Sequence, residues 1–415
     1  MSLKILHTGD WHLGQTFFEY DRQKEHAAFL RFLESVLVDK EIDVLLICGD
    51  VFDTANPSAE SQRLFFRFLR NAVTAKPDVQ IIVISGNHDS PGRLEAPNPL
   101  FEEFNIHVVG MLPRTEDRKI DYARILIPLS NKNGEKAWCL AIPFLRPGDY
   151  PGSDVSNFYT EGISKIYREA FDYADKMRKP GEAVIVLGHL HALHAQLSED
   201  DRCERLIAGG LEAVSASIFD EKIAYMALGH IHKAQKVARR NNIRYAGSPL
   251  PMSFSETGYQ HQFVYVEIVG EETVHIESIG IPTSVSLLRI PDKPKVLDEV
   301  MIELEQLPDK QEHSDAQAPY LEVNVLLDAP MPSLKNQIEI ILNNKYVRLA
   351  KITTSYGYSG DRDREKMSDP EDLQKMQPLD MLKRIYFSKY GAELPQELAD
   401  TFREALLMTN GGSNL

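Results

Sequence analysis

The sequence predicts an α/β protein whose first domain is a mixed two-sheet sandwich flanked by helices. Two observations carry this prediction. The first 90 residues alternate apolar runs of strand length with stretches of helical spacing, which is typical of a β-α-β-α-β opening. Shorter alternating segments follow, and they indicate mainly antiparallel strands that extend the sheets.

The elements of this domain are expected in the following order. The opening strands are predicted at 3–8, 43–48 and 79–84, with helices at 22–40 and 59–74. Further strands are predicted at 105–110, 123–128, 137–142, 183–187 and 223–228, a helix at 157–176, and hairpin-like segments at 234–247 and 262–280. The helix at 59–74 carries more apolar residues than one buried stripe requires. It is either buried on all sides or packs in part against another subunit.

The chain after Pro282 predicts a smaller α/β unit and a helical tail. Domains are expected at 1–282 and 283–356, followed by a charged linker at 357–377 and a tail at 378–415. In the smaller unit, strands are predicted at 285–290, 320–327 and 346–354, with helices at 295–306 and 333–344. The tail predicts helices at 380–390, ended by Gly391, and at 398–406. Two such helices cannot bury their apolar faces alone. They pack either on the main body or on a partner, and their place beyond a charged linker favours a partner.

Composition limits the class of protein. The 415 residues exceed what one core usually supports, and 43% hydrophobic with 26% charged residues is typical of a soluble globular chain. The net charge of −15 argues against binding nucleic acid by bulk electrostatics, but it leaves room for a nuclease whose metals neutralise local carboxylates. The absence of a membrane-length apolar run and of a signal peptide predicts a cytoplasmic protein. Three cysteines without metal-ligand spacing, Cys48, Cys139 and Cys203, give no thiolate site.

Polar side chains follow a glycine at the end of five apolar runs. These residues are Asp10 and His12, Asp50, Asn87 and His88, His189, and His230 and His232. Ligands in open α/β sheets bind at the carboxyl ends of the strands, so we expect the groups to form one metal site. Carboxylates, imidazoles and an amide suit manganese, iron or zinc better than magnesium alone.

The same residues suggest roles. Asp50 is the candidate to bridge two divalent ions about 3.5–4 Å apart, which would polarise a phosphate and generate hydroxide. His88 follows Asn87 and is placed to stabilise developing charge or to protonate the leaving oxygen. Asp53 and Asp89 either accept hydrogen bonds from ligand imidazoles or cap local turns.

These motifs resemble the calcineurin-like metallophosphoesterase family, whose signature is D-x-H, G-D-x-x-D, G-N-H-[DE], G-H and G-H-x-H. Every element is present across residues 10–232. The chain is closer still to the SbcD-type nuclease subunits of the bacterial SbcCD DNA repair complex, a resemblance that covers nearly the whole chain. It rests on H-T-G-D-W-H-L-G at 7–14, G-D-V-F-D-T at 49–54, I-P-F-L-R-P at 142–147, Y-A-G-S-P at 245–249 and S-F at 253–254.

The resemblance implies a four-layer metallophosphoesterase fold with a small α/β DNA-capping domain and a C-terminal helical pair. It implies a manganese-dependent hydrolase of ester bonds, a double-strand exonuclease and single-strand or hairpin endonuclease in DNA repair, replication and recombination. The partners implied are DNA, a second copy of the chain bound through helices near the N-terminus, and the coiled-coil ATPase SbcC, whose coiled-coil base the terminal helices bind.

Carried over by position, the resemblance also implies roles for single residues. It assigns Asp10, His12, Asp50 and His232 to a first metal, Asp50, Asn87, His189 and His230 to a second, and His88 to catalysis. Some relatives have histidine where this chain has Asp53. His191 and His194 lie near His189, and Gly188 favours His189 as the ligand. The alternatives are a small-molecule phosphodiesterase or phosphomonoesterase and an inactive scaffold.

Overall fold

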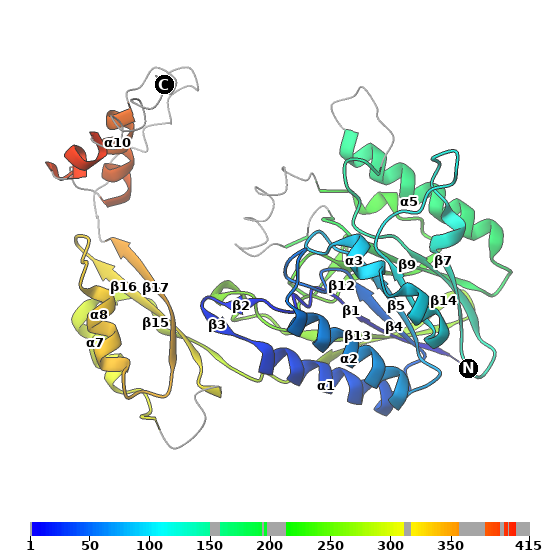
Figure 1. The fold of residues 1–415 in the computed structure, drawn as a ribbon, viewed down its shortest axis with the longest axis horizontal. Coiled ribbons are helices and arrows are strands. Elements are labelled where there is room, and N and C mark those ends of the chain that lie inside the picture. Colours follow the sequence, from blue (N-terminus) through cyan, green and yellow to red (C-terminus); the bar gives the residue numbers. More distant parts are fainter. Residues whose placement is uncertain are drawn as a thin grey trace. The chain divides into compact units, whose positions relative to one another are not determined.

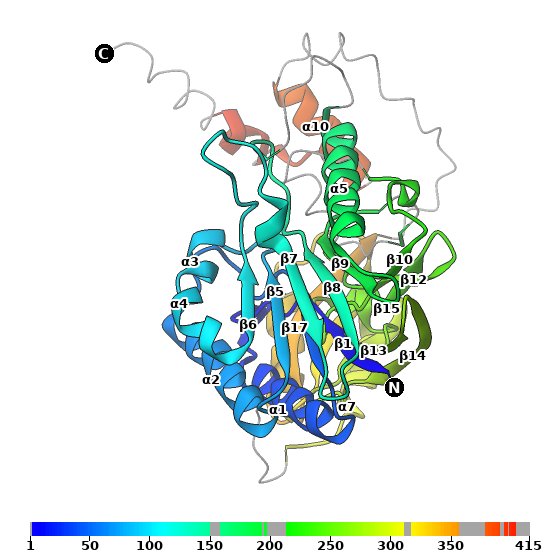
Figure 2. The ribbon, with the colours of Figure 1, turned by 90° about the vertical axis from the view of Figure 1, so that its right-hand side faces the viewer.

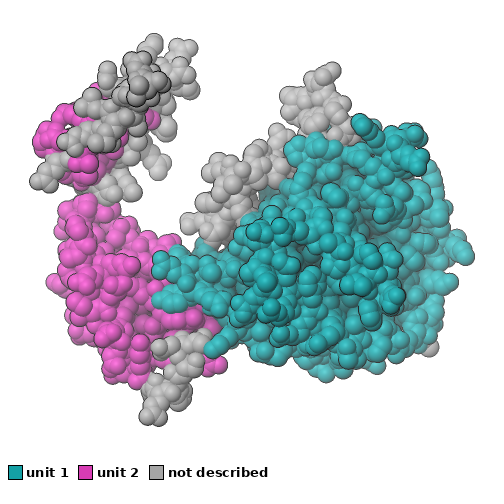
Figure 3. Space-filling view, viewed as in Figure 1, with its two compact units in different colours: residues 1–284 teal, residues 285–415 magenta. Residues whose placement is uncertain are grey.

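The computed structural model describes residues 2–149, 158–192, 195–196, 213–310, 317–356, 378–390, 394–396 and 398–403. The chain forms two compact units, residues 1–284 and residues 285–415 (Figure 3). None of the helices in the described ranges is long and apolar enough to cross a membrane. The expected linker at 357–377, the glycine expected to end the first tail helix, and residues 404–406 lie outside the described residues.

The first unit contains two six-stranded sheets, and both are mixed. Sheet 1 has the order β14-β13-β1-β4-β5-β6, in which β1, β4, β5 and β6 run parallel and β13 pairs antiparallel with both β1 and β14. Its strands are β1 (Leu3–Thr8), β4 (Val44–Cys48), β5 (Gln80–Ile84), β6 (Ile106–Val109), β13 (Gln262–Val269) and β14 (Glu272–Gly280). The sequence therefore predicted the opening of this sheet correctly.

Sheet 2 has the order β11-β12-β10-β9-β8-β7, and Figure 2 shows β7, β8 and β9 side by side. Its strands are β7 (Leu126–Ser130), β8 (Lys136–Ala141), β9 (Ala183–His189), β10 (Ile223–Gly229), β11 (Gln235–Val237) and β12 (Arg240–Tyr245). Strands β8, β9, β10 and β12 run parallel, so the expectation of mainly antiparallel strands is wrong for this sheet. Long crossover connections, such as the helix between β8 and β9, allow that direction.

Helices cover the outer faces of both sheets and complete a four-layer sandwich, as the fold class predicted. Helices α1 (Gln23–Asp39) and α2 (Ala59–Ala75) lie on one side, and α5 (Phe158–Met177) lies on the other (Figure 1). Strand β4 shows why the runs are continuously apolar. Leu45 and Ile47 pack with the α1–α2 layer, whereas Leu46 packs in the core shared with sheet 2. Both faces of the strand are therefore buried.

Shorter elements account for most differences from the predicted boundaries. They are β2 (Thr16–Phe17), β3 (Tyr20–Asp21), α3 (Pro91–Glu95), α4 (Asn98–Phe101) and the 3-10 turns η1 (Glu102–Phe104), η2 (Tyr122–Ile125), η3 (Ala216–Ile218) and η4 (Phe254–Glu256). The strand expected at 123–128 begins as η2.

In the β11–β12 hairpin, Ala238 and Arg239 both have positive φ, 48° and 62°. The hairpin expected at 234–247 is therefore present, but its turn lacks the Asn or Gly that usually adopts this conformation, so the sequence did not locate the turn residues.

The second unit is a small α/β fold with a parallel sheet. Its strands β15 (Leu287–Val296), β16 (Tyr320–Leu327) and β17 (Arg348–Tyr356) alternate with α7 (Leu297–Glu305) and α8 (Leu334–Leu342), and a helix α10 (Pro378–Tyr390) follows. Strand β15 continues past Pro291 and Pro294, where a strand end was expected. The strand lies at the sheet edge and its register shifts there, so the missing amide hydrogens remove few ladder bonds.

A buried histidine joins the two sheets of the first unit. His7 on β1 is fully buried, its Nδ1 lies 2.9 Å from the Tyr225 hydroxyl, and its Nε2 lies 3.2 Å from the Leu228 carbonyl oxygen on β10. The carbonyl can only accept, so Nε2 donates to it and Nδ1 accepts from the tyrosine. Burial lowers the pKa of His7 to about 3, so this ring remains neutral at ordinary pH.

We expect His7→Leu to reduce the acid sensitivity of folding while lowering stability at neutral pH. The folded pKa lies below the unfolded value of 6.5, so the unfolded state takes up the proton first. The stability that His7 contributes is present above pH 6.5 and is lost as pH falls, by about 1.4 kcal/mol per pH unit. Between pH 6.5 and 5 the stability difference between the variant and wild type should therefore narrow by about 2 kcal/mol. Urea unfolding at each pH, in the presence of a metal chelator, measures this difference in the free energy of unfolding.

The matched control for this prediction is Tyr225→Phe. That variant removes the hydroxyl but keeps the imidazole, so it should lose stability at neutral pH and retain the wild-type slope against pH. A His7→Leu variant with the same slope as wild type would show that His7 titrates normally.

Candidate metal centre

The predicted ligands lie at the carboxyl ends of five strands from the two sheets. Strands β1, β4 and β5 are neighbours in sheet 1, and β9 and β10 are neighbours in sheet 2. The loop after β1 is bonded to the loop after β4, since the backbone amides of Asp10 and His12 donate to the carbonyl oxygens of Gly49 and Asp50 at 3.0 Å each. Five sequence-distant loops therefore meet at one edge of the sandwich.

Asp50 lies at the centre of this group and is buried. Its Oδ2 lies 3.3 Å from His189 Nε2 and 3.8 Å from His12 Nε2. Its Oδ1 accepts a hydrogen bond from the His88 backbone amide at 2.9 Å. One carboxylate oxygen thus faces imidazoles from both sides of the centre, which is the geometry that a bridging ligand needs.

On the side of the centre nearest β10, Asn87 lies between two imidazoles. Its Oδ1 is 3.0 Å from His189 Nε2 and 3.0 Å from His230 Nδ1. Asp50, His189 and His230 offer ligand atoms that all lie within 4.8 Å of one another. The structure therefore brings these four groups together as one donor set.

On the opposite side, the imidazole rings of His12 and His232 lie edge to face, with centroids 5.2 Å apart. Asp10 is fully buried, and its Oδ1 accepts from the His230 backbone amide at 2.8 Å and lies 3.9 Å from His189 Nδ1. Asp10 thereby connects the side that holds His12 and His232 to the side that holds His189 and His230. His12 also forms a group with Asp53 and His88 whose ligand atoms lie within 4.8 Å of one another.

The donor set fits divalent cations. His189 Nδ1 lies 2.8 Å from the Cys48 carbonyl oxygen and must donate to it. Nε2 faces the Asp50 and Asn87 oxygens, and its lone pair would be free for a metal ion once the ring is neutral. Among the described residues, Asp10 Oδ2 and His12 Nε2 are buried without a hydrogen-bond partner. Acceptors that face each other in a buried space are stabilised by a cation between them.

The electrostatics of the site agree with this interpretation. Burial raises the pKa of Asp10 to about 6. Burial lowers the pKa of His189, but the Asp50 carboxylate outweighs it and the pKa rises to about 9. In the metal-free protein a proton on His189 therefore takes the place of a cation, and metal binding would release it.

The backbone at the ligands is strained. Asp10, His12, Asp50 and His230 have positive φ values of 52°, 45°, 47° and 99°, a region that residues other than glycine enter at a cost of about 1–3 kcal/mol each. Gly229 precedes one of them, and a Cβ there would collide with the Cys48 carbonyl oxygen. Strain that gathers at one place is typical of functional sites.

Two acidic residues near the predicted ligands form different contacts. Asp53 Oδ1 lies 3.2 Å from His12 Nδ1, so of the two expected alternatives it takes the contact to an imidazole. Asp89 instead accepts from the backbone amides of Val51, Phe52 and Gly86 at 2.9–3.2 Å, which is the turn-capping alternative.

Two contacts to the ligand imidazoles carried no sequence signal. Glu256 lies 3.3 Å from His232 Nδ1, and the Cys48 carbonyl holds His189. The Cys48 thiol donates to the Ala227 carbonyl oxygen at 3.5 Å and packs in the core between the sheets. Of the other histidines near His189, His191 is buried outside both donor groups, and His194 lies outside the described residues.

Comparison with known proteins identifies the family. A family model described as calcineurin-like phosphoesterase matches residues 3–234, the span that contains all of the ligand loops. The chain belongs to the calcineurin-like phosphoesterase family. A second model, described as the type 5 capsule protein repressor C-terminal domain (SbcD_C), matches residues 284–390 of this phosphoesterase.

Several relatives of this phosphoesterase carry one name, the D subunit of nuclease SbcCD. The chain is 35% identical to the protein of that name in Rhodobacter capsulatus, over 91% of this chain and 92% of that protein. It is 28% identical to the one in Escherichia coli K12, over 85% of each chain. It is 34% identical to the one in Bacillus subtilis, over 65% of this chain and 68% of the relative. The resemblance to SbcD-type proteins is thus confirmed.

Proposed function

We propose that this phosphoesterase is a metal-dependent DNA nuclease that acts as the SbcD component of an ATP-dependent SbcCD complex. The observation that supports this most is the meeting of carboxylate, amide and imidazole donors from five loops around Asp50. The names of the relatives support the same function. Its activities would be those of a double-strand exonuclease and a single-strand or hairpin endonuclease.

The proposed ligands divide into two sets that share Asp50. Asp10, His12, Asp50 and His232 would hold the first cation, and Asp50, Asn87, His189 and His230 would hold the second. This mixture of imidazole and oxygen donors favours Mn²⁺ over Mg²⁺, which prefers oxygen and water. When bound, such a pair of cations polarises a phosphodiester and lowers the pKa of water.

His88 is the proposed general acid. Its backbone amide is fixed by Asp50, and its Nδ1 donates to the Asp53 carbonyl oxygen at 2.8 Å. The proton on Nδ1 is therefore committed to the backbone, and Nε2 is the atom that would transfer a proton to the leaving oxygen. The ring lies edge to face with His12, with centroids 4.8 Å apart, so it is adjacent to the ligands.

The test of this function uses Mn²⁺ with linear duplex DNA in one set of reactions, and cyclic nucleotides and phosphomonoesters in another. Cleavage of duplex DNA that improves when the SbcC-type ATPase and ATP are added supports the proposal. Hydrolysis confined to the small esters would favour a small-molecule phosphoesterase instead, and no hydrolysis of either class would favour an inactive scaffold.

The smaller unit is the proposed DNA-capping domain. One face of its sheet packs against α7 and α8. Charged side chains cross the strands around Glu322, which lies 2.6 Å from Arg289 Nε and 3.3 Å from Lys351 Nζ and accepts from the Thr353 hydroxyl. Arg348 lies over the Tyr320 ring at 3.8 Å. Cations outnumber anions in this group, which suits a surface near a phosphate backbone.

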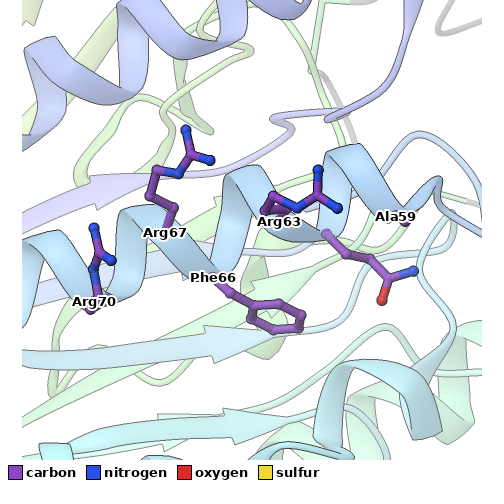
Figure 4. Close-up of a pocket in the computed structure, with 6 residues that line it drawn as sticks. Ala59, Arg63, Phe66, Arg67 and Arg70 are labelled. Atoms are coloured by element: carbon purple, nitrogen blue, oxygen red, sulfur yellow. The ribbon is translucent and has the colours of Figure 1, made fainter.

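The exposed face of α2 is the proposed contact between two copies of the chain. Figure 4 shows Arg63, Arg67 and Arg70 projecting to one side of the helix and Phe66 to the other. Phe66 is 36% exposed and lies near Phe101. The neighbouring α4–η1 segment exposes apolar Leu100 and Phe104 beside acidic Glu102 and Glu103. A basic helix and an acidic, apolar segment on one surface are complementary across a two-fold axis.

We expect Leu100→Glu to convert a dimer into a monomer at micromolar concentration, because Leu100 is 71% exposed and a buried, unpaired carboxylate opposes association. Sedimentation velocity measures the change. Ile340→Glu is the matched control, since Ile340 is equally exposed, at 68%, but lies on α8 of the other unit. Dimers that survive Leu100→Glu, or are lost in both variants, would contradict the assignment of this face.

The C-terminal helices are the proposed binding site for the coiled-coil base of SbcC. Their exposed apolar residues Met381 and Leu398 support this assignment. We expect deletion of 378–415 to abolish co-purification with SbcC while the Mn²⁺-dependent cleavage of single strands remains, because every ligand precedes residue 233. Affinity co-purification of the two proteins measures this, and unchanged co-purification would contradict the assignment.

A further inference from the structure

The loop at residues 248–256, which follows β12 and ends with η4, joins two ligand loops. The Ser248 amide donates to the His232 carbonyl oxygen at 3.1 Å, so the loop begins against the G-H-x-H motif. The Met252 carbonyl accepts from Gln15 Nε2 at 3.5 Å. Gln15 in turn donates its amide to the His12 carbonyl oxygen at 2.9 Å. The loop is therefore bonded to the segments that carry His12 and His232.

Glu256 is the residue of this loop that touches a ligand. It is completely buried, its Oε1 lies 3.3 Å from His232 Nδ1, and its Oε2 accepts from the Met252 amide at 2.9 Å. An ionised carboxylate only accepts hydrogen bonds, so Nδ1 carries the proton and Nε2 is left as the ligand nitrogen. A carboxylate behind a metal-binding imidazole sets both the tautomer and the direction of the ring.

A buried arginine fixes the loop in place. Arg22 is 1% exposed, and its Nη1 donates to the Pro251 carbonyl oxygen at 2.6 Å and to Gln15 Oε1 at 2.8 Å. Its charge is balanced by Glu25, which accepts from Nε and Nη2 at 3.3 and 3.0 Å. A buried ion pair contributes little net stability because of the cost of desolvation. Its geometric effect is to hold Pro251 against the segment that follows His12.

We propose that Glu256 is a positioning residue for the His12 and His232 side of the metal centre, and that Arg22 holds its loop in register. The other side has different supports, since the Cys48 carbonyl orients His189 and Asn87 lies against both His189 and His230. Loss of Glu256 should therefore weaken one cation position selectively. This inference rests on the two-cation centre of the proposed function.

The test is a titration of the full-length, metal-free protein with Mn²⁺, followed by calorimetry. Wild type should bind two cations. Glu256→Gln keeps the size of the side chain but offers only one acceptor oxygen, so it loses the bond to His232 or the bond to Met252. We expect one of the two binding constants to fall about 10- to 100-fold, and the other to stay within about threefold. Arg22→Lys should give a smaller loss at the same position.

The matched control is Ser253→Ala. Ser253 Oγ accepts from the Ser255 amide at the start of η4, so this variant perturbs the same turn and keeps Glu256. It should bind both cations as wild type does. Circular dichroism melting in chelator establishes that each variant is folded before the titration.

The outcomes separate the inference from the proposed function. A wild-type protein that binds no Mn²⁺ would overturn the two-cation centre itself. Two cations in wild type and unchanged binding in Glu256→Gln would overturn the role of Glu256 alone. An equal loss at both positions, or the same loss in Ser253→Ala, would also overturn it, because the effect would then come from folding of the loop.

Discussion

Asp50→Asn is expected to cost about 10³-fold or more in Mn²⁺-dependent DNA cleavage and to remove at least one bound cation. Asp50 Oδ2 lies 3.3 Å from His189 Nε2 and 3.8 Å from His12 Nε2, so a single oxygen faces one imidazole from each of the two proposed ligand sets. The amide keeps the shape and removes the negative charge that attracts both cations. The expected 10³-fold loss in cleavage rate corresponds to about 4 kcal/mol less stabilisation of the transition state.

Metal analysis and single-turnover cleavage measure this prediction together. Asp53→Asn is its matched control, because Asp53 lies against His12 from the outer side of the ring. An outer carboxylate of this kind is worth about 10- to 100-fold in metal affinity, so excess Mn²⁺ should restore much of the control's activity but not that of Asp50→Asn. If Asp50→Asn retained two cations and most of its turnover, Asp50 would not be the shared ligand.

His88→Gln is expected to keep both cations and lose about 10²- to 10⁴-fold in turnover, the range for general acid catalysis. The His88 backbone amide, which donates to Asp50, is unchanged by this substitution. Asp50 therefore keeps this hydrogen bond in the variant. If His88 protonates the leaving oxygen, the loss should be large on DNA and small on a p-nitrophenyl phosphodiester, whose leaving group needs no proton.

His107→Gln is the control for this variant, because His107 is a half-buried histidine within β6 that belongs to neither donor group. It should cleave both substrates at the wild-type rate. Loss of a cation in His88→Gln would show that His88 is a ligand, as its proximity to His12 and Asp53 allows. An equal loss on DNA and on the activated ester would exclude proton transfer to the leaving group.

The structure brings the predicted ligands together, and each of their five motifs follows a glycine at the end of an apolar run. The apolar run indicates that the strand is buried, and the glycine indicates that two loops approach each other closely. At Gly49, for example, φ is 87° and a Cβ would meet the His189 ring. Apolar strand cores and glycine-led polar residues are local features, so they can be recognised without knowing which strands pair.

Other features depend on tertiary contacts and left no local pattern. Glu256 lies in an irregular Ser- and Thr-containing loop, and only the fold places it behind His232. Parallel pairing of β9 with β10 depends on the crossover between them. Arg146 lies in the I-P-F-L-R-P stretch, where the sequence alone favours a solvated surface arginine. Its guanidinium instead bonds to the backbone oxygens of Gly86 and Asp89 at 3.3 Å, which fixes the loop of the third motif.

The pairing of β1 has a consequence for synthesis of the chain on the ribosome. Strand β1 pairs with β4 on one side and with β13 on the other, and His7 bonds to Tyr225 and Leu228 on β10. Strand β4 follows soon after β1, but the β13 and β10 partners of β1 lie more than 200 residues later in the chain. A nascent chain cannot bring all five loops of the proposed centre together until residue 232 has left the exit tunnel. The proposed activity would therefore begin only when translation of the first unit is nearly complete.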